Sequence, residues 1–327
     1  DQLVASRAVV VATGSDALIP PIEGLREASP WTNREATTTH TVPRRLLILG
    51  GGVVGVEMAQ AFASLRCTVT LVEGGDRILA HEEPFASQQV HESLEQRGVT
   101  IIINANASAV RRDGEVTMEL DGHGPLSGDE ILVAVGRSVN TRDIGLENVG
   151  LKPGDPVEVR DSMQSISHDW LYAIGDVNGR VLLTHMGKYQ GRLAADHIVG
   201  KPVELRSDGA QSPRVIFTDP QIAAVGHTEA SAREAGLNIR VVEVGSGANA
   251  GGSFYGRNAP GTARIVVDED RGVMVGATFT GPDIGEFIHA ATIAIIGEVP
   301  LERLWHAVPS FPTRSELWLR LLEKYGL

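Results

Sequence analysis

The sequence has one cysteine, no long apolar run and no cluster of basic residues. With Cys67 alone, no disulfide can form within the chain, which indicates a reducing, cytoplasmic environment. The most apolar candidate segment, residues 288–296, is too short to span a bilayer and contains His289 and Thr292. The first residues do not resemble a signal peptide. We therefore expect a protein that neither crosses a membrane nor depends on disulfides.

The charge balance and the absence of certain motifs exclude further classes of function. The formal net charge is −12 and the basic residues are scattered, which argues against nucleic acid as a partner. The ten histidines show no ligand spacing with acids or cysteines, so we predict no metal site. The nucleophile elbow of hydrolases is absent as well. A chain of 327 residues is long enough for two or three domains with a sizeable core.

A glycine-rich motif between two apolar strands is the most informative feature that is present. Residues 46–49 read Leu-Leu-Ile-Leu, which predicts a buried strand. This strand leads into Gly50-x-Gly52-x-x-Gly55, a helix is expected over residues 56–65, and a second strand over residues 67–72 ends at Glu73. This order is the pattern of a dinucleotide-binding βαβ unit. The alternative is a glycine-rich turn that binds no ligand.

Each glycine of this motif has a physical reason. Gly50 permits the tight turn, Gly52 lets the backbone approach a pyrophosphate, and Gly55 lets the helix pack against the strand. The helix N-terminus, where Val53 and Val54 lie, offers N–H groups and a partial positive charge to phosphates.

Glu73 bears on the choice of dinucleotide. Its carboxylate can accept hydrogen bonds from a ribose diol and would repel a 2′-phosphate, which favours NAD over NADP. The small residues Gly74 and Gly75 that follow leave room, so NADP stays open.

Other apolar strands also end at glycines or acids. Residues 8–12 precede Thr13-Gly14, residues 130–135 precede Gly136, and residues 171–174 precede Gly175-Asp176. The dipeptide Asp121-Gly122 predicts a turn, and a helix is expected over residues 184–198. After Pro213, short strands, one of them over residues 262–268, alternate with helices, one of them over residues 285–296, which predicts a separate α+β domain.

Together these segments resemble the pyridine nucleotide-disulfide oxidoreductase family. Four of them follow the family's order, namely Ala12-Thr13-Gly14, Gly50 to Glu73, Ala134 to Arg137 with Asn140, and Ala173 to Asp176. The resemblance implies an α/β fold in which a Rossmann-type NAD domain is inserted in a partial FAD domain and is followed by an α+β dimerisation domain. The implied boundaries are 1–30 for a remnant of the FAD domain, 31–138 for the NAD domain, 139–208 for the returning FAD part and 209–327 for dimerisation.

The resemblance also implies the site residues. The NAD site would comprise Gly50, Gly52, Val53, Val54, Gly55, Glu73 and Gly136, and the FAD site would comprise Thr13, Gly14, Gly175, Asp176 and His185. Asp176 would accept hydrogen bonds from the ribityl chain of the flavin, although an acid after a strand can also be a helix N-cap. His185 alone would be an ordinary partly buried histidine.

Glu57 matches a family glutamate that pairs with a lysine beside the flavin. Its alternative role is that of a helix N-terminal acid stabilised by the helix dipole.

Two departures from the family pattern concern the mechanism. The family's first FAD-binding βαβ unit, its redox-active cysteine pair and the flavin-pairing lysine have no counterpart in this sequence, so we expect a fragment of a longer protein rather than a natural short form. At the other end, the family's His-Pro-Thr-x-x-Glu reads Phe311-Pro312-Thr313-Arg314-Ser315-Glu316 here. Phe311 cannot act as the general base that Glu316 would orient.

The resemblance therefore favours branches that use a non-thiol acceptor, such as soluble transhydrogenases or quinone-reducing relatives. The expected function is an FAD-dependent NAD(P)H oxidoreductase, or a fragment of one, that passes hydride from NADH through the flavin to a small-molecule acceptor such as a quinone, as a homodimer. The alternative is a catalytically silent NAD-binding and dimerisation fragment without FAD. A third hypothesis has a separate polypeptide supply the missing N-terminal FAD half.

Overall fold

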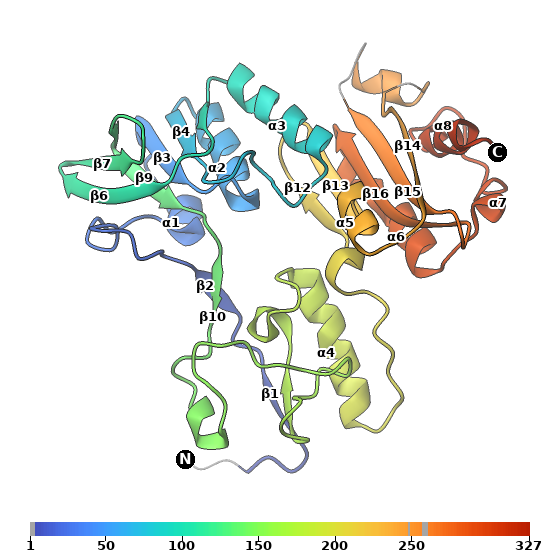
Figure 1. Cartoon of the computed structure of the whole chain (residues 1–327), viewed down its shortest axis with the longest axis horizontal. Coiled ribbons are helices and arrows are strands. Elements are labelled where there is room, and N and C mark those ends of the chain that lie inside the picture. Colours follow the sequence, from blue (N-terminus) through green and yellow to red (C-terminus); the bar gives the residue numbers. More distant parts are fainter. Residues whose placement is uncertain (1–3, 248, 257–260) are drawn as a thin grey trace. The chain divides into compact units, whose positions relative to one another are not determined.

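The structure is a computed structural model that describes residues 4–247, 249–256 and 261–327. The fold is α/β, as expected, and the chain separates into two compact units (Figure 1). The first unit comprises residues 1–16 and 137–212, and the second comprises residues 17–136 and 213–327.

A parallel sheet in the second unit carries the glycine motif. Its strand order is β5 (Thr100–Ile102), β4 (Thr68–Val72), β3 (Arg45–Leu49) and β9 (Glu130–Val133). Leu46 and Ile48 of β3 belong to the core cluster that includes helices α2 (Val53–Ser64) and α3 (Pro84–Gln96), while Leu47 and Leu49 belong to the cluster on the opposite face. Burial on both faces explains the continuous apolar run of β3.

The expected strand–helix–strand order is confirmed, with one difference. Helix α2 begins at Val53, three residues earlier than expected, because Gly52 is its N-cap and the helix starts directly from the glycine turn.

A three-stranded antiparallel sheet covers the opposite face of β3. It consists of β6 (Ala107–Asp113), β7 (Glu115–Leu120) and β8 (Leu126–Gly128). The chain reverses first at Gly114, whose φ of +75° suits glycine, and a second time after Leu120, where Asp121-Gly122 predicted a turn. Helix α1 (Asn33–Thr38) precedes β3 and begins with a capping box of Thr32 and Glu35.

The first unit is built on short strands. β1 (Val9–Val11) pairs in parallel with β11 (Leu171–Ala173), and β2 (Ser15–Ala17) pairs with β10 (Arg137–Val139). The 3₁₀ helix η2 (Gly175–Asn178) follows β11 directly, and α4 (Thr184–Ile198) packs against it.

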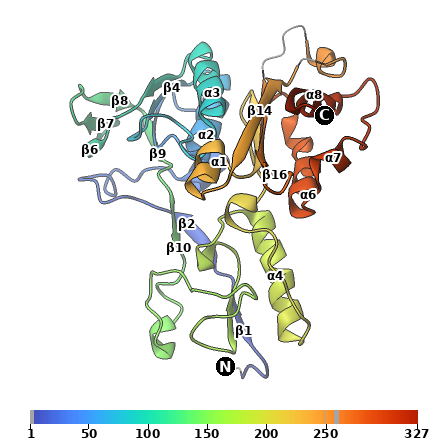
Figure 2. The ribbon, with the colours of Figure 1, turned by 45° about the vertical axis from the view of Figure 1, so that its right-hand side comes forward.

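The C-terminal part of the second unit is an antiparallel sheet. Its order is β12 (Arg214–Ile216), β13 (Gln221–Gly226), β16 (Val273–Gly281), β15 (Thr262–Asp268) and β14 (Ile239–Gly245). Figure 2 shows helices α6 (Ile288–Ile296) and α8 (Glu316–Tyr325) on one side of this sheet.

Successive side chains of β15 point to opposite faces of this sheet. Ala263, Ile265 and Val267 pack with α6 and α8, which leaves Arg264 on the opposite face. That face carries α5 (Glu229–Glu234), and Arg264 contacts Glu229 there. The helix expected over residues 285–296 is divided into η5 (Ile284–Glu286) and α6, and the short helix α7 (Leu301–Leu304) follows.

Candidate functional site

Gly50 and Gly55 are required by the packing of the chain itself. Gly50 has a φ of +108°, and a Cβ there would lie 2.6 Å from the carbonyl oxygen of Ala134. A Cβ on Gly55 would lie 1.9 Å from the carbonyl oxygen of Gly50. The turn and the close approach of α2 to β3 therefore explain both glycines without any ligand.

Gly52 is different, because nothing among the residues that the structure describes requires a glycine there. An added Cβ would meet no atom closer than the Ala134 carbonyl oxygen at 3.9 Å, and φ is −74°. Gly52 is exposed, and no side chain caps the helix that starts after it, at Val53 and Val54. The first N–H groups of α2 are thus left for solvent or a ligand, which is the arrangement that binds phosphate.

Glu73 directly follows β4, and its carboxylate accepts hydrogen bonds from two backbone N–H groups. Its Oε2 accepts a 2.6 Å hydrogen bond from the Gly51 N–H, and its Oε1 accepts a 2.7 Å bond from the Gly75 N–H. Each carboxylate oxygen has a further acceptor position, so a ribose hydroxyl can still bind. The sequence pattern did not reveal this link between Gly51 and Glu73.

Gly136 lies near the same edge of the sheet as the glycine turn. β3 and β9 are adjacent parallel strands, so residues that follow them meet at one edge. Gly136 has a φ of +145°, and its carbonyl oxygen accepts a 3.0 Å hydrogen bond from the Leu18 N–H. The second unit therefore brings together Gly50, Gly52, Gly55, Glu73 and the 134–136 segment.

The candidate FAD residues gather in the first unit for an equivalent reason. The parallel pairing of Val11 with Ala173 places Thr13-Gly14 and Gly175-Asp176 at one edge. Thr13 donates its hydroxyl to the Asn140 carbonyl oxygen (2.6 Å), and the Gly14 carbonyl oxygen accepts from the Asn140 N–H (2.9 Å). The Gly175 N–H donates to Gln190 Oε1 of α4 over 2.8 Å.

The structure contradicts the N-cap role considered for Asp176 and the partial burial considered for His185. Ile174 is the N-cap of η2 and Asp176 lies inside that helix, so the N-cap interpretation of Asp176 is wrong. Asp176 Oδ2 instead accepts from the Ser15 hydroxyl and lies 3.5 Å from Arg137 Nε. His185 is exposed in the first turn of α4 rather than partly buried.

Glu57 contacts the C-terminal part of the second unit. Its Oε1 accepts a 2.8 Å hydrogen bond from the Phe217 N–H, and Gln60, one turn later on α2, accepts a 2.7 Å bond from the Asp219 N–H. Burial raises the pKa of Glu57 above its ordinary value, and the bond from Phe217 partly opposes this rise. Glu57 thus helps to hold the 217–219 segment against α2.

Phe311 and Glu316 have opposite environments. Phe311 is 76% exposed, whereas Glu316, the first residue of α8, is 9% exposed. Within the part of the chain that the structure describes, Oε2 of Glu316 has no hydrogen-bond partner. A pocket of about 500 Å³ lies beside this segment and is lined by Ser310, Thr313, Trp318 and the small residues Ala290 and Ala294 of α6.

Cys67 is a buried free thiol. It is 6% exposed in the core around α2 and β4, and burial raises its pKa to about 11. Among the described residues, no three His, Cys, Asp or Glu side chains are placed to hold a metal ion. In the same residues, no helix combines the length and apolarity needed to cross a bilayer.

Comparison with known proteins gives matches over nearly the whole chain. Residues 1–191 match the family described as pyridine nucleotide-disulphide oxidoreductase, and residues 212–321 match its dimerisation domain. A dihydrolipoyl dehydrogenase of Haloferax volcanii is 34% identical over 96% of this chain and 67% of its own length. A mercuric reductase of Shigella flexneri is 32% identical over 93% of this chain and 54% of its own length.

Two solved structures share the fold over a similar extent. The HOCl-induced flavoprotein disulfide reductase RclA of Escherichia coli gives a TM-score of 0.86 at 26% identity, over 97% of this chain and 73% of that one. LpdA of Mycobacterium tuberculosis gives a TM-score of 0.86 at 27% identity, over 98% of this chain and 70% of that one. The chain thus spans between about half and three quarters of the length of these proteins. With its glycine turn, its acid after β4 and both family matches, the chain belongs to the pyridine nucleotide-disulphide oxidoreductase family.

Proposed function

We propose that this chain acts in an FAD-dependent NADH oxidoreductase that passes hydride through the flavin to a non-thiol acceptor such as a quinone. The family to which it belongs supports the oxidoreductase class. The observation that carries the choice of acceptor is Phe311, which stands where the thiol-processing members have a histidine. A phenyl ring cannot take the proton of a dithiol.

The residues around the glycine turn fit NAD. Gly52 and the uncapped start of α2, at Val53 and Val54, would bind the pyrophosphate. Glu73 would accept from the adenosine ribose and would repel the 2′-phosphate of NADP. Gly52 carries this argument, since the packing of the described residues gives no other reason for a glycine at that position.

The residues of the first unit fit part of an FAD site. One sheet edge carries Thr13, Gly14, Gly175 and Asp176. His185 lies in the first turn of α4, the helix that packs against Gly175. A bound flavin would supply the hydride chemistry, and the chain would bind and orient it. Asp176 would accept from the ribityl chain while Arg137 and Ser15 hold its carboxylate in place.

The proposed domain boundaries are 1–30 and 139–208 for the FAD part, 31–138 for the NAD part and 209–327 for dimerisation. The match of residues 212–321 to the family's dimerisation domain supports a homodimer formed through that last part.

The acceptor preference is tested with the purified chain supplied with FAD. We expect NADH oxidation with a benzoquinone and none above background with oxidised lipoamide. The variant Phe311→His, at an exposed position, should keep the fold and the quinone activity. A wild-type chain that retains FAD but oxidises no NADH above background with the benzoquinone would overturn the choice of acceptor.

A second candidate function is an NAD-binding and dimerisation fragment that holds no FAD. The observation that favours it is that one unit contains all the candidate NAD residues Gly50, Gly52, Gly55 and Glu73, so that NAD binding would not need the first unit. A chain that binds NADH tightly but retains no FAD would support this candidate.

A further inference from the structure

We propose that Arg214 is a positioning residue for the dinucleotide site and contributes to the preference for NADH over NADPH. It would act through Glu82 and the loop of residues 74–83, which follows Glu73. The inference rests on the proposed NAD site but not on the proposed electron acceptor.

The loop contacts the glycine turn at Gly51. The Leu79 N–H donates a 2.9 Å hydrogen bond to the Gly51 carbonyl oxygen. The side chain of Ile78 closes the space beside Gly51, since an added Cβ there would lie 2.8 Å from its Cγ2. Gly51 is therefore held by Glu73 through its N–H and by the loop through its carbonyl oxygen.

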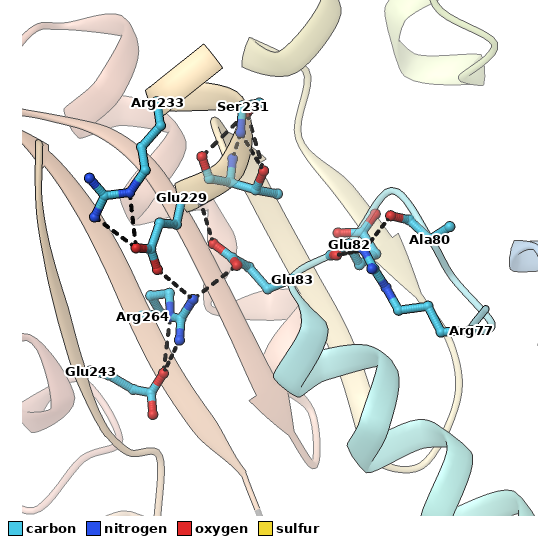
Figure 3. Close-up of polar contacts among 10 residues, drawn as sticks. Arg77, Ala80, Glu82, Glu83, Glu229, Ser231, Arg233, Glu243 and Arg264 are labelled. Carbon is cyan, nitrogen blue, oxygen red and sulfur yellow. Dashed lines mark hydrogen bonds and ion pairs between the residues drawn. The ribbon is translucent and has the colours of Figure 1, made fainter. Parts of the chain in front are cut away.

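Glu82 fixes the far end of this loop. Its N–H donates to the Leu79 carbonyl oxygen over 2.9 Å, which closes a turn over residues 79–82. Arg77 donates to the carbonyl oxygens of Ala80 (2.6 Å) and Glu82 (3.3 Å), so the loop is also tied internally (Figure 3).

The carboxylate of Glu82 is paired with Arg214 of β12. Arg214 donates from Nε to Oε1 over 2.6 Å and from Nη2 to Oε2 over 2.9 Å, in a two-bond fork. Glu82 is 5% exposed, so its carboxylate has little contact with water and relies on Arg214 as its partner. A buried carboxylate that loses its cation is strongly destabilised where it lies and moves toward water. This movement would shift the 79–82 turn and weaken the support of Gly51.

The adjacent acid, Glu83, has a separate role, which makes the effect of Arg214 local. Glu83 is 1% exposed, and it accepts from Arg264 Nη1 (2.9 Å) and from the Glu229 N–H (2.8 Å) (Figure 3). Gln89 further along α3 is bonded to Thr262 and Thr280. Because these contacts already fasten α3 to the C-terminal sheet, loss of the Arg214–Glu82 pair should loosen the loop without separating α3 from that sheet.

The consequence for the ligand follows from Glu73. This carboxylate accepts hydrogen bonds from the N–H of Gly51, in the glycine turn, and from the N–H of Gly75, at the start of the loop. A looser Gly51 leaves the carboxylate less fixed against the ribose, so NADH binds more weakly. The same loosening lets the carboxylate turn away from a 2′-phosphate, so NADPH loses less affinity than NADH.

The test measures Kd for NADH and for NADPH by calorimetry on the full chain. The variants are Arg214→Lys, which keeps the charge but not the fork, and Arg214→Met. The control is Arg271→Met, which removes an arginine paired with Glu298 and Asp268 elsewhere in the C-terminal part. Thermal unfolding shows whether each variant is folded at the assay temperature.

We expect Arg214→Met to raise the NADH Kd by about tenfold and Arg214→Lys by about threefold, with the NADPH-to-NADH Kd ratio falling in both. Arg271→Met should change neither quantity. If Arg214→Met is unfolded, Arg214→Lys decides. Unchanged Kd values and an unchanged ratio in a folded Arg214→Lys variant would overturn the role of Arg214. The proposed NAD site would not be affected by that result. A wild-type chain that binds no NADH would overturn the NAD site first and the inference with it.

Discussion

The Gly51 N–H donates a 2.6 Å hydrogen bond to Oε2 of Glu73, so the acid at the end of β4 fastens the glycine turn at the end of β3. One side chain would therefore both shape the phosphate-binding turn and contact the ribose. A change at Glu73 should alter stability and cofactor preference together.

The variant Glu73→Gln tests this double role. Its amide oxygen can accept only one of the two backbone bonds, and its NH₂ group faces the other N–H, so we expect a loss of about 1–3 kcal/mol in the free energy of unfolding. Without the negative charge, the NADPH-to-NADH Kd ratio should fall. Urea unfolding and calorimetric titration measure the two effects. A variant that discriminates against NADPH as strongly as the wild type would contradict the role of Glu73.

Two glycines of the same motif should respond differently to alanine. The methyl group of Gly52→Ala meets open space, so this variant should change the free energy of unfolding by less than about 1 kcal/mol. The same methyl group would lie where the pyrophosphate approaches the backbone, so NADH binding should weaken by about tenfold or more. Gly55→Ala would place a methyl group against the Gly50 carbonyl oxygen and should cost about 3 kcal/mol or unfold the chain. Undiminished NADH affinity in Gly52→Ala would argue against phosphate binding at this turn.

Glu57 makes stability depend on pH in a defined direction. Since burial raises its pKa in the folded chain, the folded state keeps this proton at pH values where the unfolded chain has lost it. The contribution of Glu57 to the free energy of unfolding therefore becomes less favourable as the pH rises from about 4.3, the pKa in the unfolded chain, to the higher pKa in the folded chain. Glu57→Gln, whose amide oxygen still accepts from Phe217, should gain stability relative to wild type as the pH rises above about 4.3. A stability difference between the two proteins that does not change as the pH rises above this value would contradict the prediction.

Cys67 should not react in the folded chain. With a pKa of about 11, roughly 0.1% of the thiol is ionised at about pH 8, and the sulfur is buried. We expect no labelling by a chromogenic disulfide reagent under native conditions and labelling of one thiol per chain in guanidinium chloride. Rapid labelling of the native chain would show that the thiol is accessible.

The strands, helices and glycine motif that could be predicted from the sequence are those that depend on patterns among neighbouring residues. The run of residues 46–49, the three glycines and the acid at Glu73 follow one another within a single βαβ unit, and the structure places them as expected. The helix over residues 184–198 and the strand over residues 262–268 were likewise readable from their periodicity and their flanking glycines.

The contacts that were missed join residues far apart in the sequence. Glu82 meets Arg214 across 132 positions, and Glu57 meets the Phe217 N–H across 160 positions. A charged residue before a helix has the same local pattern whether it faces water or a buried arginine, so only the tertiary structure distinguishes them. The single helix expected over residues 285–296 failed for a related reason, since Asp283 adopts a φ of +50° and the chain first forms η5.

The most direct test is the visible absorption spectrum of the purified chain after incubation with FAD and removal of the excess. We expect a flavin band that elutes with the protein, is bleached by NADH without oxygen and returns when a benzoquinone is added. A colourless chain that retains no FAD would contradict the proposed oxidoreductase activity of this chain and would leave NAD binding as its function.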